Sequence, residues 1–134
     1  MKTLRSHVLG SWHEADSGFA DLHDPCTEAV IARASSAGID FGEVLRYARE
    51  TGGPELRAMT FAERGAMLKA MSKALGAHRD ELIELSRLNT GVTDNDAKFD
   101  LDGATGTLGY YAFLSKGLGE RTVLADGDSA QLAR

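Results

Sequence analysis

Apolar and polar residues alternate in short runs over the first 36 positions, a pattern typical of β-strands. The segment Leu4–His13 predicts one strand, and Phe19–Leu22 is expected to pair back on it as an antiparallel hairpin. After the breaker Asp24-Pro25, the run Glu28–Ala34 predicts another short extended piece. Strands this short do not form a stable sheet by themselves. The first 36 residues therefore form an arm that needs other structure to lie against.

From Ile39 onward the apolar residues change to helical spacing. Asp40 is placed to cap a helix that begins at Phe41, because a carboxylate can accept the free amides of the first turn. Apolar residues then recur on one side of the helix. We expect Gly52-Gly53-Pro54 to end this helix.

A helical hairpin is the clearest local pattern in the sequence. Thr60 and Glu63 form a capping box, in which each side chain satisfies an amide of the other residue. An apolar stripe follows, made of Phe61, Met67, Leu68, Met71 and Leu75. Gly76 and Asp80 suggest a break, after which apolar positions continue toward Gly91. The pattern predicts two helices between Thr60 and Gly91.

A third helical region is predicted from Asp94 to Leu118. It contains three interior glycines, Gly103, Gly106 and Gly109. Each glycine costs about 1 kcal/mol relative to alanine in a helix, so we expect another helix or backbone to pack closely on this bare surface. The residues from Glu120 to Arg134 read as a polar tail with a turn at 126–128.

Composition narrows the class of protein. The 134 residues suit one domain, and 15 Lys and Arg against 20 Asp and Glu give a net charge of −5. An acidic chain of this kind lacks the basic surface of nucleic-acid-binding and membrane-surface proteins. The sequence contains no apolar run long enough to span a bilayer and no secretory signal pattern. The single cysteine, Cys26, fits a reducing cytoplasm, so we expect a cytoplasmic protein.

Glycine and acidic motifs in the third helix carry no ligand-binding signal. The spacing of Gly103, Gly106 and Gly109 does not match a dinucleotide-binding loop, which also needs a preceding strand. A calcium loop needs a carboxylate at its first position and a glutamate at its twelfth, where this chain has Lys98 and Gly109. The nearby aspartates are expected to form a solvated helix face.

Histidine and cysteine residues near the N-terminus are the other candidates for chemistry. His7, His13, His23, Asp24 and Cys26 match no zinc-binding spacing. Asp24 places a negative charge beside Cys26, which disfavours a reactive thiolate. We therefore expect no catalytic, cofactor-binding or metal-binding residue in this sequence.

Several short motifs nevertheless resemble the N-terminal end of the aldehyde dehydrogenases. The resemblance begins with Gly10-Ser11-Trp12 and Asp24-Pro25-Cys26-Thr27 and continues through the helical pair. Three further segments, Ala34–Asp40, Gly53–Phe61 and Asp100–Gly103, are similar to the branch that oxidises CoA-linked semialdehydes in benzoate or phenylacetate degradation. The chain departs from that branch at Cys26 and at Ala104-Thr105.

The resemblance implies an α/β parent enzyme that uses NADP or NAD and is a homo-oligomer. Within it, residues 1–36 form an antiparallel strand arm, 37–119 form three or four helices, and 120–134 form the tail, without the Rossmann-like sheet. The family's catalytic and cofactor-binding residues have no counterpart here, so the segment alone is expected to bind no cofactor and to be inactive. Its expected partner is the remainder of the dehydrogenase chain.

Two other functions remain open from the residues alone. The apolar helix faces would also suit a stand-alone helical module that docks on a partner protein. A small metal-binding protein that uses the His and Cys residues is the weaker alternative.

Overall fold

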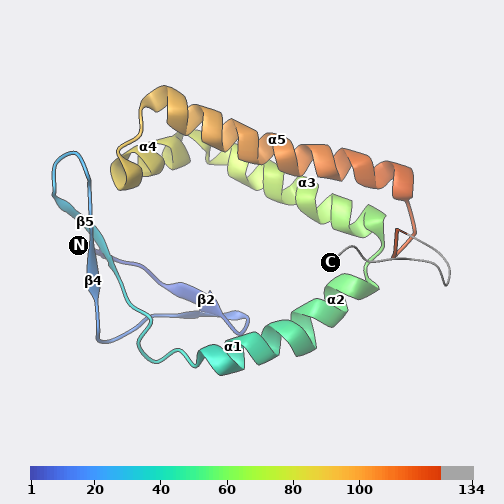
Figure 1. Cartoon of the computed structure of the whole chain (residues 1–134), viewed down its shortest axis with the longest axis horizontal. Helices are drawn as coiled ribbons and strands as arrows, with labels where there is room; N and C mark the ends of the chain where they lie inside the picture. The colour runs from blue at the N-terminus through green and yellow to red at the C-terminus, as the bar shows by residue number, and fades with distance from the viewer. Residues whose placement is uncertain (125–134) are drawn as a thin grey trace, which may run out of the picture.

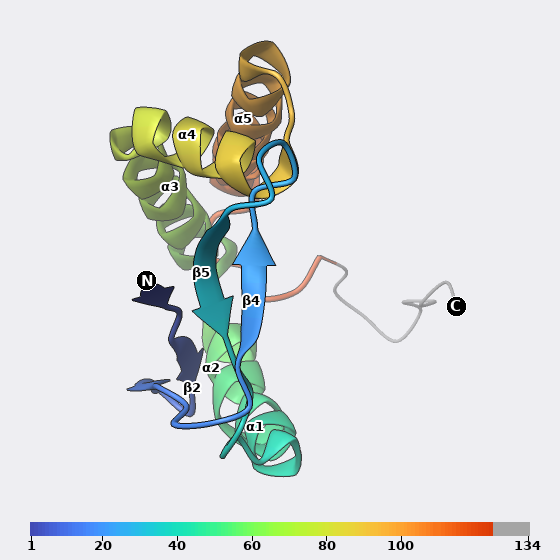
Figure 2. The same ribbon diagram turned by 90° about the vertical axis from the view of Figure 1, so that its left-hand side faces the viewer.

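The computed structural model describes residues 1–124, so the turn expected at 126–128 lies outside the described residues. The elements form an open frame rather than a layered domain (Figure 1). Helices α3 (Phe61–Ala77) and α5 (Asp94–Leu118) run side by side along one edge, and α1 (Phe41–Tyr47) and α2 (Gly53–Ala58) form the opposite edge. Strands β4 (Ala20–His23) and β5 (Val30–Ala34) stand at one end, whereas β2 (Ser6–Val8) lies along the α1 edge. Seen from the strand end, β4 and β5 stand side by side with α4 beyond them (Figure 2).

The N-terminal arm contains five short strands: β1 (Lys2–Thr3), β2 (Ser6–Val8), β3 (Ser11–His13), β4 (Ala20–His23) and β5 (Val30–Ala34). One sheet has the order β1-β5-β4, and β2 pairs with β3 as a separate hairpin. The expected strand at Glu28–Ala34 is confirmed by β5, whereas the single strand expected over Leu4–His13 is wrong.

A tight turn divides that predicted strand. Leu9 and Gly10 have φ angles of 53° and 77°, so the chain reverses between β2 and β3. Consecutive positive φ values match the right-handed twist of a two-stranded hairpin. Leu9 gives no sequence signal for such a turn, because a leucine rarely adopts this conformation.

The pairing of the arm also differs from the expectation. β4 pairs antiparallel with β5, not with the first strand, and β1 pairs parallel with β5. The expected hairpin of Phe19–Leu22 with the first strand is therefore wrong. The arm combines antiparallel and parallel pairs, because β5 lies between the chain's first residues and β4.

The first helical rod is longer than the sequence predicts. Asp40 caps α1 (Phe41–Tyr47) by accepting the amide of Glu43 at 3.0 Å, as expected. The helix then passes through a π-helical turn, η1 (Ala48–Gly52), into α2 (Gly53–Ala58). The end predicted at Gly52-Gly53-Pro54 is wrong. Pro54 sits in the first turn of α2, where its missing amide hydrogen costs little.

The remaining helices follow the sequence pattern closely. They are α3 (Phe61–Ala77), α4 (Arg79–Thr90) and α5 (Asp94–Leu118). The capping box of Thr60 and Glu63 is present, and the break between α3 and α4 falls at His78. Gly91 ends α4 in the left-handed conformation, with φ of 70°.

The tightest packing in the described chain lies between α3 and α5. Gly65 of α3 faces Ser115 of α5, and a Cβ placed on Gly65 would lie 2.6 Å from the Ser115 Cβ. Ala112 and Ser115 are buried at this crossing, and Ala97 is 1% exposed nearer the start of α5. The absence of a side chain at Gly65 lets the two helices approach.

Little of the molecule is buried. The accessible surface is 10086 Å², whereas a compact globular protein of 14.3 kDa exposes about 6,800 Å². The buried apolar residues within 1–124 are Ala15, Ala32, Ile83, Ala97 and Ala112, mostly alanines. Large apolar side chains remain exposed on every helix. No helix among the described residues has the length and hydropathy of a membrane span.

Candidate functional site

Cys26 lies in a tight turn between β4 and β5 that is organised by Asp24. The Asp24 carboxylate accepts the backbone amide of Cys26 at 2.8 Å and the Thr27 hydroxyl at 2.9 Å. These bonds, the amide of Cys26 first, hold the pKa of Asp24 below its ordinary value. Cys26 itself is exposed. Asp24 has a structural role here, since it shapes the turn.

The N-terminal histidines do not come together as a metal site. His13 donates from Nε2 to the carbonyl of Ala37 at 2.8 Å, and His23 donates from Nδ1 to the carbonyl of Glu28 at 2.9 Å. The His7 ring packs edge-on against Trp12, with centroids 5.0 Å apart. Within residues 1–124, no three His, Cys, Asp or Glu side chains are grouped closely enough to hold a metal ion.

The acidic run at the start of α5 forms ion pairs within the chain. Arg79 of α4 donates two hydrogen bonds to the Asp102 carboxylate, at 2.8 and 2.7 Å, while Lys98 pairs with Asp94 one turn away. The bond from Arg79 is the main cause that lowers the pKa of Asp102. These carboxylates join α4 to α5 and organise the first turns of α5.

Among the described residues, no helix or backbone packs closely on the three interior glycines of α5, contrary to the expectation. Nothing lies within 4 Å of a Cβ placed on Gly103 or Gly106, and Gly109 has only the Ser72 hydroxyl oxygen, at 4.0 Å. The expectation that another backbone packs on them is therefore wrong within the described residues. The close approach occurs at Gly65, on the partner helix.

A junction that the sequence does not reveal joins α3 to the chain after α5. The amides of Phe61 and Ala62, in the first turn of α3, donate to the carbonyls of Arg121 and Gly119. Arg64 donates to the carbonyls of Met59 and Thr122, both at 2.7 Å, and stacks on the Phe61 ring. The free amides of a helix start are thus satisfied by a distant segment, which no local motif could indicate.

Two apolar pockets open on the molecule. One, of about 670 Å³, lies between the three-stranded sheet and α4 and is lined mainly by Leu4, Leu22, Ile31, Leu82 and Leu85. The other, of about 430 Å³, lies between α3 and α5 beside Leu68 and Leu118. Neither lining contains a carboxylate, histidine or cysteine; Lys2 and Ser86 line the first pocket, and Tyr111 and Ser115 line the second.

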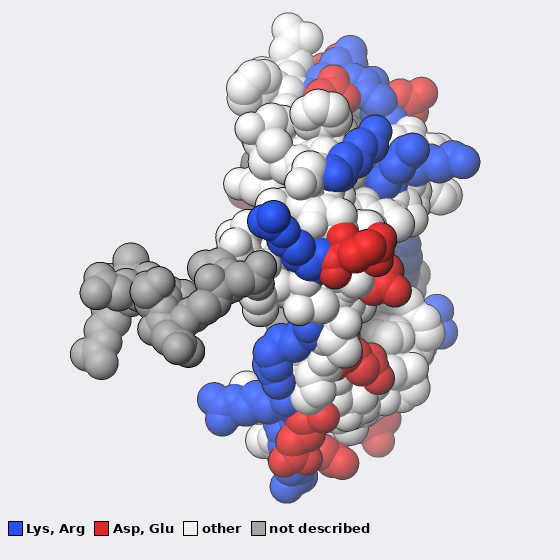
Figure 3. Space-filling view, turned by 90° about the vertical axis from the view of Figure 1, so that its right-hand side faces the viewer, with Lys and Arg blue, Asp and Glu red and all other residues white. Residues whose placement is uncertain are grey.

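The charged surface also lacks a strongly basic patch on the face shown. Lys and Arg side chains are interspersed with Asp and Glu among uncharged residues (Figure 3).

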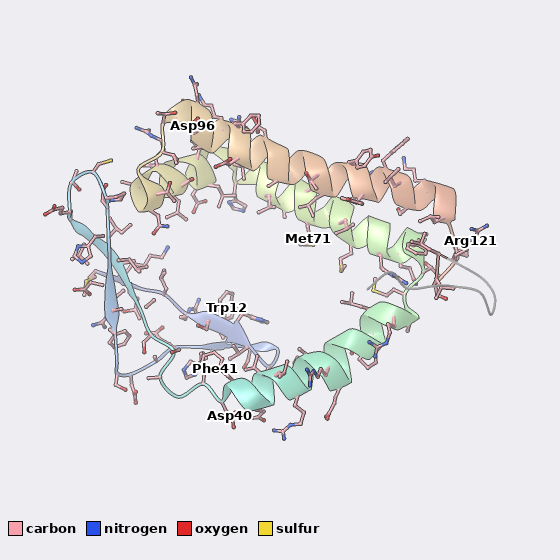
Figure 4. All side chains as sticks on the ribbon, viewed as in Figure 1. Trp12, Asp40, Phe41, Met71, Asp96 and Arg121 are labelled. Carbon is pink, nitrogen blue, oxygen red and sulfur yellow. The ribbon has the colours of Figure 1, made fainter. Side chains whose placement is uncertain are left out.

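Apolar side chains instead face each other across the frame. Met71 lies on the side of α3 toward the hairpin, and Trp12, 62% exposed, lies on the side of the hairpin toward α3 (Figure 4). The described residues thus present exposed apolar surfaces on both sides of the frame.

Comparison with known proteins gives this arrangement a family. The sequence pattern of the aldehyde dehydrogenase family matches residues 12–134. The chain belongs to the aldehyde dehydrogenase family. It is 41% identical over 131 residues to the 3,4-dehydroadipyl-CoA semialdehyde dehydrogenase of Aromatoleum evansii, covering 98% of this chain and 25% of that protein. It is 28% identical to retinal dehydrogenase 2 of Gallus gallus, covering 96% of this chain and 26% of the relative.

Solved structures of dehydrogenases contain the same fold. An NAD-dependent benzaldehyde dehydrogenase from Corynebacterium glutamicum superposes with a TM-score of 0.70 at 25% identity, covering 80% of this chain and 24% of its own. A betaine aldehyde dehydrogenase from Staphylococcus aureus, in complex with NAD+, gives 0.70 at 27% identity, covering 80% and 22%. The chain thus spans about a quarter of the length of each relative, and it contains no Rossmann-like sheet within residues 1–124.

Proposed function

We propose that these residues are the N-terminal scaffold of a longer NAD(P)-dependent semialdehyde dehydrogenase. The longer enzyme oxidises a CoA-linked semialdehyde to the acid during the degradation of benzoate or phenylacetate. The supporting observation is the 41% identity to a CoA-linked semialdehyde dehydrogenase over almost the whole chain, against 28% for a retinal dehydrogenase. In the overall reaction, aldehyde, water and NAD(P)+ give acid, NAD(P)H and a proton.

The chemistry of that reaction explains why this segment is a scaffold. Aldehyde oxidation requires a thiolate that adds to the carbonyl, donors that hold the resulting oxyanion, and a nicotinamide at hydride-transfer distance. Cys26, the one thiol of the sequence, stands exposed in the turn that Asp24 organises. The linings of the two apolar pockets lack carboxylates, histidines and cysteines. The helices and the arm instead provide a rigid support on which an active site can be built.

A chimeric enzyme, which we call the joined protein, tests this function. In it, residues 1–134 of this chain replace the matching quarter of the Aromatoleum evansii relative. We expect reduction of NAD+ or NADP+ with a CoA-linked semialdehyde by the joined protein and by the native relative. The chain alone is expected to give none above background. Activity from the chain alone would contradict the scaffold role.

A matched variant checks that Cys26 takes no part in the chemistry. Cys26→Ser in the joined protein is expected to leave kcat and KM within about twofold, since a turn residue contributes nothing to the transition state. A loss of several orders of magnitude in kcat would instead assign the nucleophile to Cys26.

A stand-alone helical interaction module is the alternative that the exposed apolar faces favour. It predicts that the isolated chain is a stable monomer or dimer that binds a separate protein. A joined protein with no dehydrogenase activity, together with a well-folded isolated chain, would support the module. Assembly of the longer enzyme as a homo-oligomer stays a prediction, which sedimentation of the active joined protein tests.

A further inference from the structure

We draw no further inference here: the strongest candidate, the apolar pocket of about 670 Å³ between the three-stranded sheet and α4, stands open in the described part of the chain, and nothing in the structure shows what covers it.

Discussion

At the residue scale, the contact of Gly65 with Ser115 decides how closely α3 and α5 approach. Gly65→Ala is expected to destabilise this packing by about 1 to 3 kcal/mol, because the new Cβ would lie 2.6 Å from the Ser115 Cβ. Hydrogen exchange of the α3 and α5 amides measures the change as a local opening free energy.

The control for this prediction is Gly76→Ala, also on α3. Nothing lies within 4 Å of its new Cβ, so alanine is expected to stabilise the helix by about 0.5 to 1 kcal/mol. Opposite signs at the two glycines would support the packing described; a destabilisation of equal size at both would contradict it.

Glu28 gives a second prediction at this scale. Its φ of 62° places it in the left-handed region, while its side chain is exposed. Glu28→Gly is expected to stabilise the turn after β4 by about 1 kcal/mol, since glycine adopts this conformation without strain. Glu28→Ala keeps the Cβ and should give no such gain. Hydrogen exchange at the Cys26 amide reports both changes.

The sequence could predict the helix caps but not the turns with a positive φ angle. Asp40 and Thr60 were identifiable as helix caps because capping depends on a side chain and an amide three residues away. The turns at Leu9 and Glu28 were not, because neither residue type favours a positive φ. The link of Arg64 to Thr122 joins residues far apart in sequence, so only the fold reveals it.

At the scale of elements, Arg79 and Asp102 connect α4 to α5. The pKa of Asp102 is lowered, so its charged form favours the folded state. This contribution is complete above the ordinary carboxyl pKa and is lost as the pH falls through the lowered value. We expect protection of the α4 amides from hydrogen exchange to weaken with acid over that range.

Asp102→Asn is expected to reduce that protection at neutral pH and to remove this part of its pH dependence. Asp100→Asn serves as the control, because Asp100 forms no ion pair within residues 1–124. If both variants behaved alike, the connection through Arg79 would not be responsible.

Local sequence patterns were sufficient to predict the bounds of some helices but not of others. The range of α5 was predictable from apolar spacing and flanking residues alone. The rod of α1, η1 and α2 was not, because Gly52-Gly53-Pro54 ends most helices, yet here a π-helical turn carries the chain across it. Strand pairing also escaped prediction, since the residues of β1 pair with residues of β5 that lie thirty positions later in the chain.

At the scale of the whole molecule, large apolar side chains are exposed along the helices and the arm. The accessible surface of 10086 Å² exceeds that of a compact protein of 14.3 kDa, about 6,800 Å², and we propose that further polypeptide stabilises the frame by covering it. Within residues 1–124, no three His, Cys, Asp or Glu side chains could together hold a metal ion, and the expectation that the sequence alone supplies no active site stays a prediction. The sequence could not predict which apolar helix faces are exposed. An apolar face shows that a helix can pack against something, but it does not show which element covers it.

Small-angle scattering of the isolated chain, combined with its thermal unfolding, measures whether these residues are compact and cooperative without further polypeptide. A compact domain of 134 residues has a radius of gyration of about 14 Å. We expect a clearly larger radius and a broad transition, both replaced by compact, cooperative behaviour in the joined protein. A monomer of about 14 Å that unfolds in one sharp transition by itself would contradict this expectation.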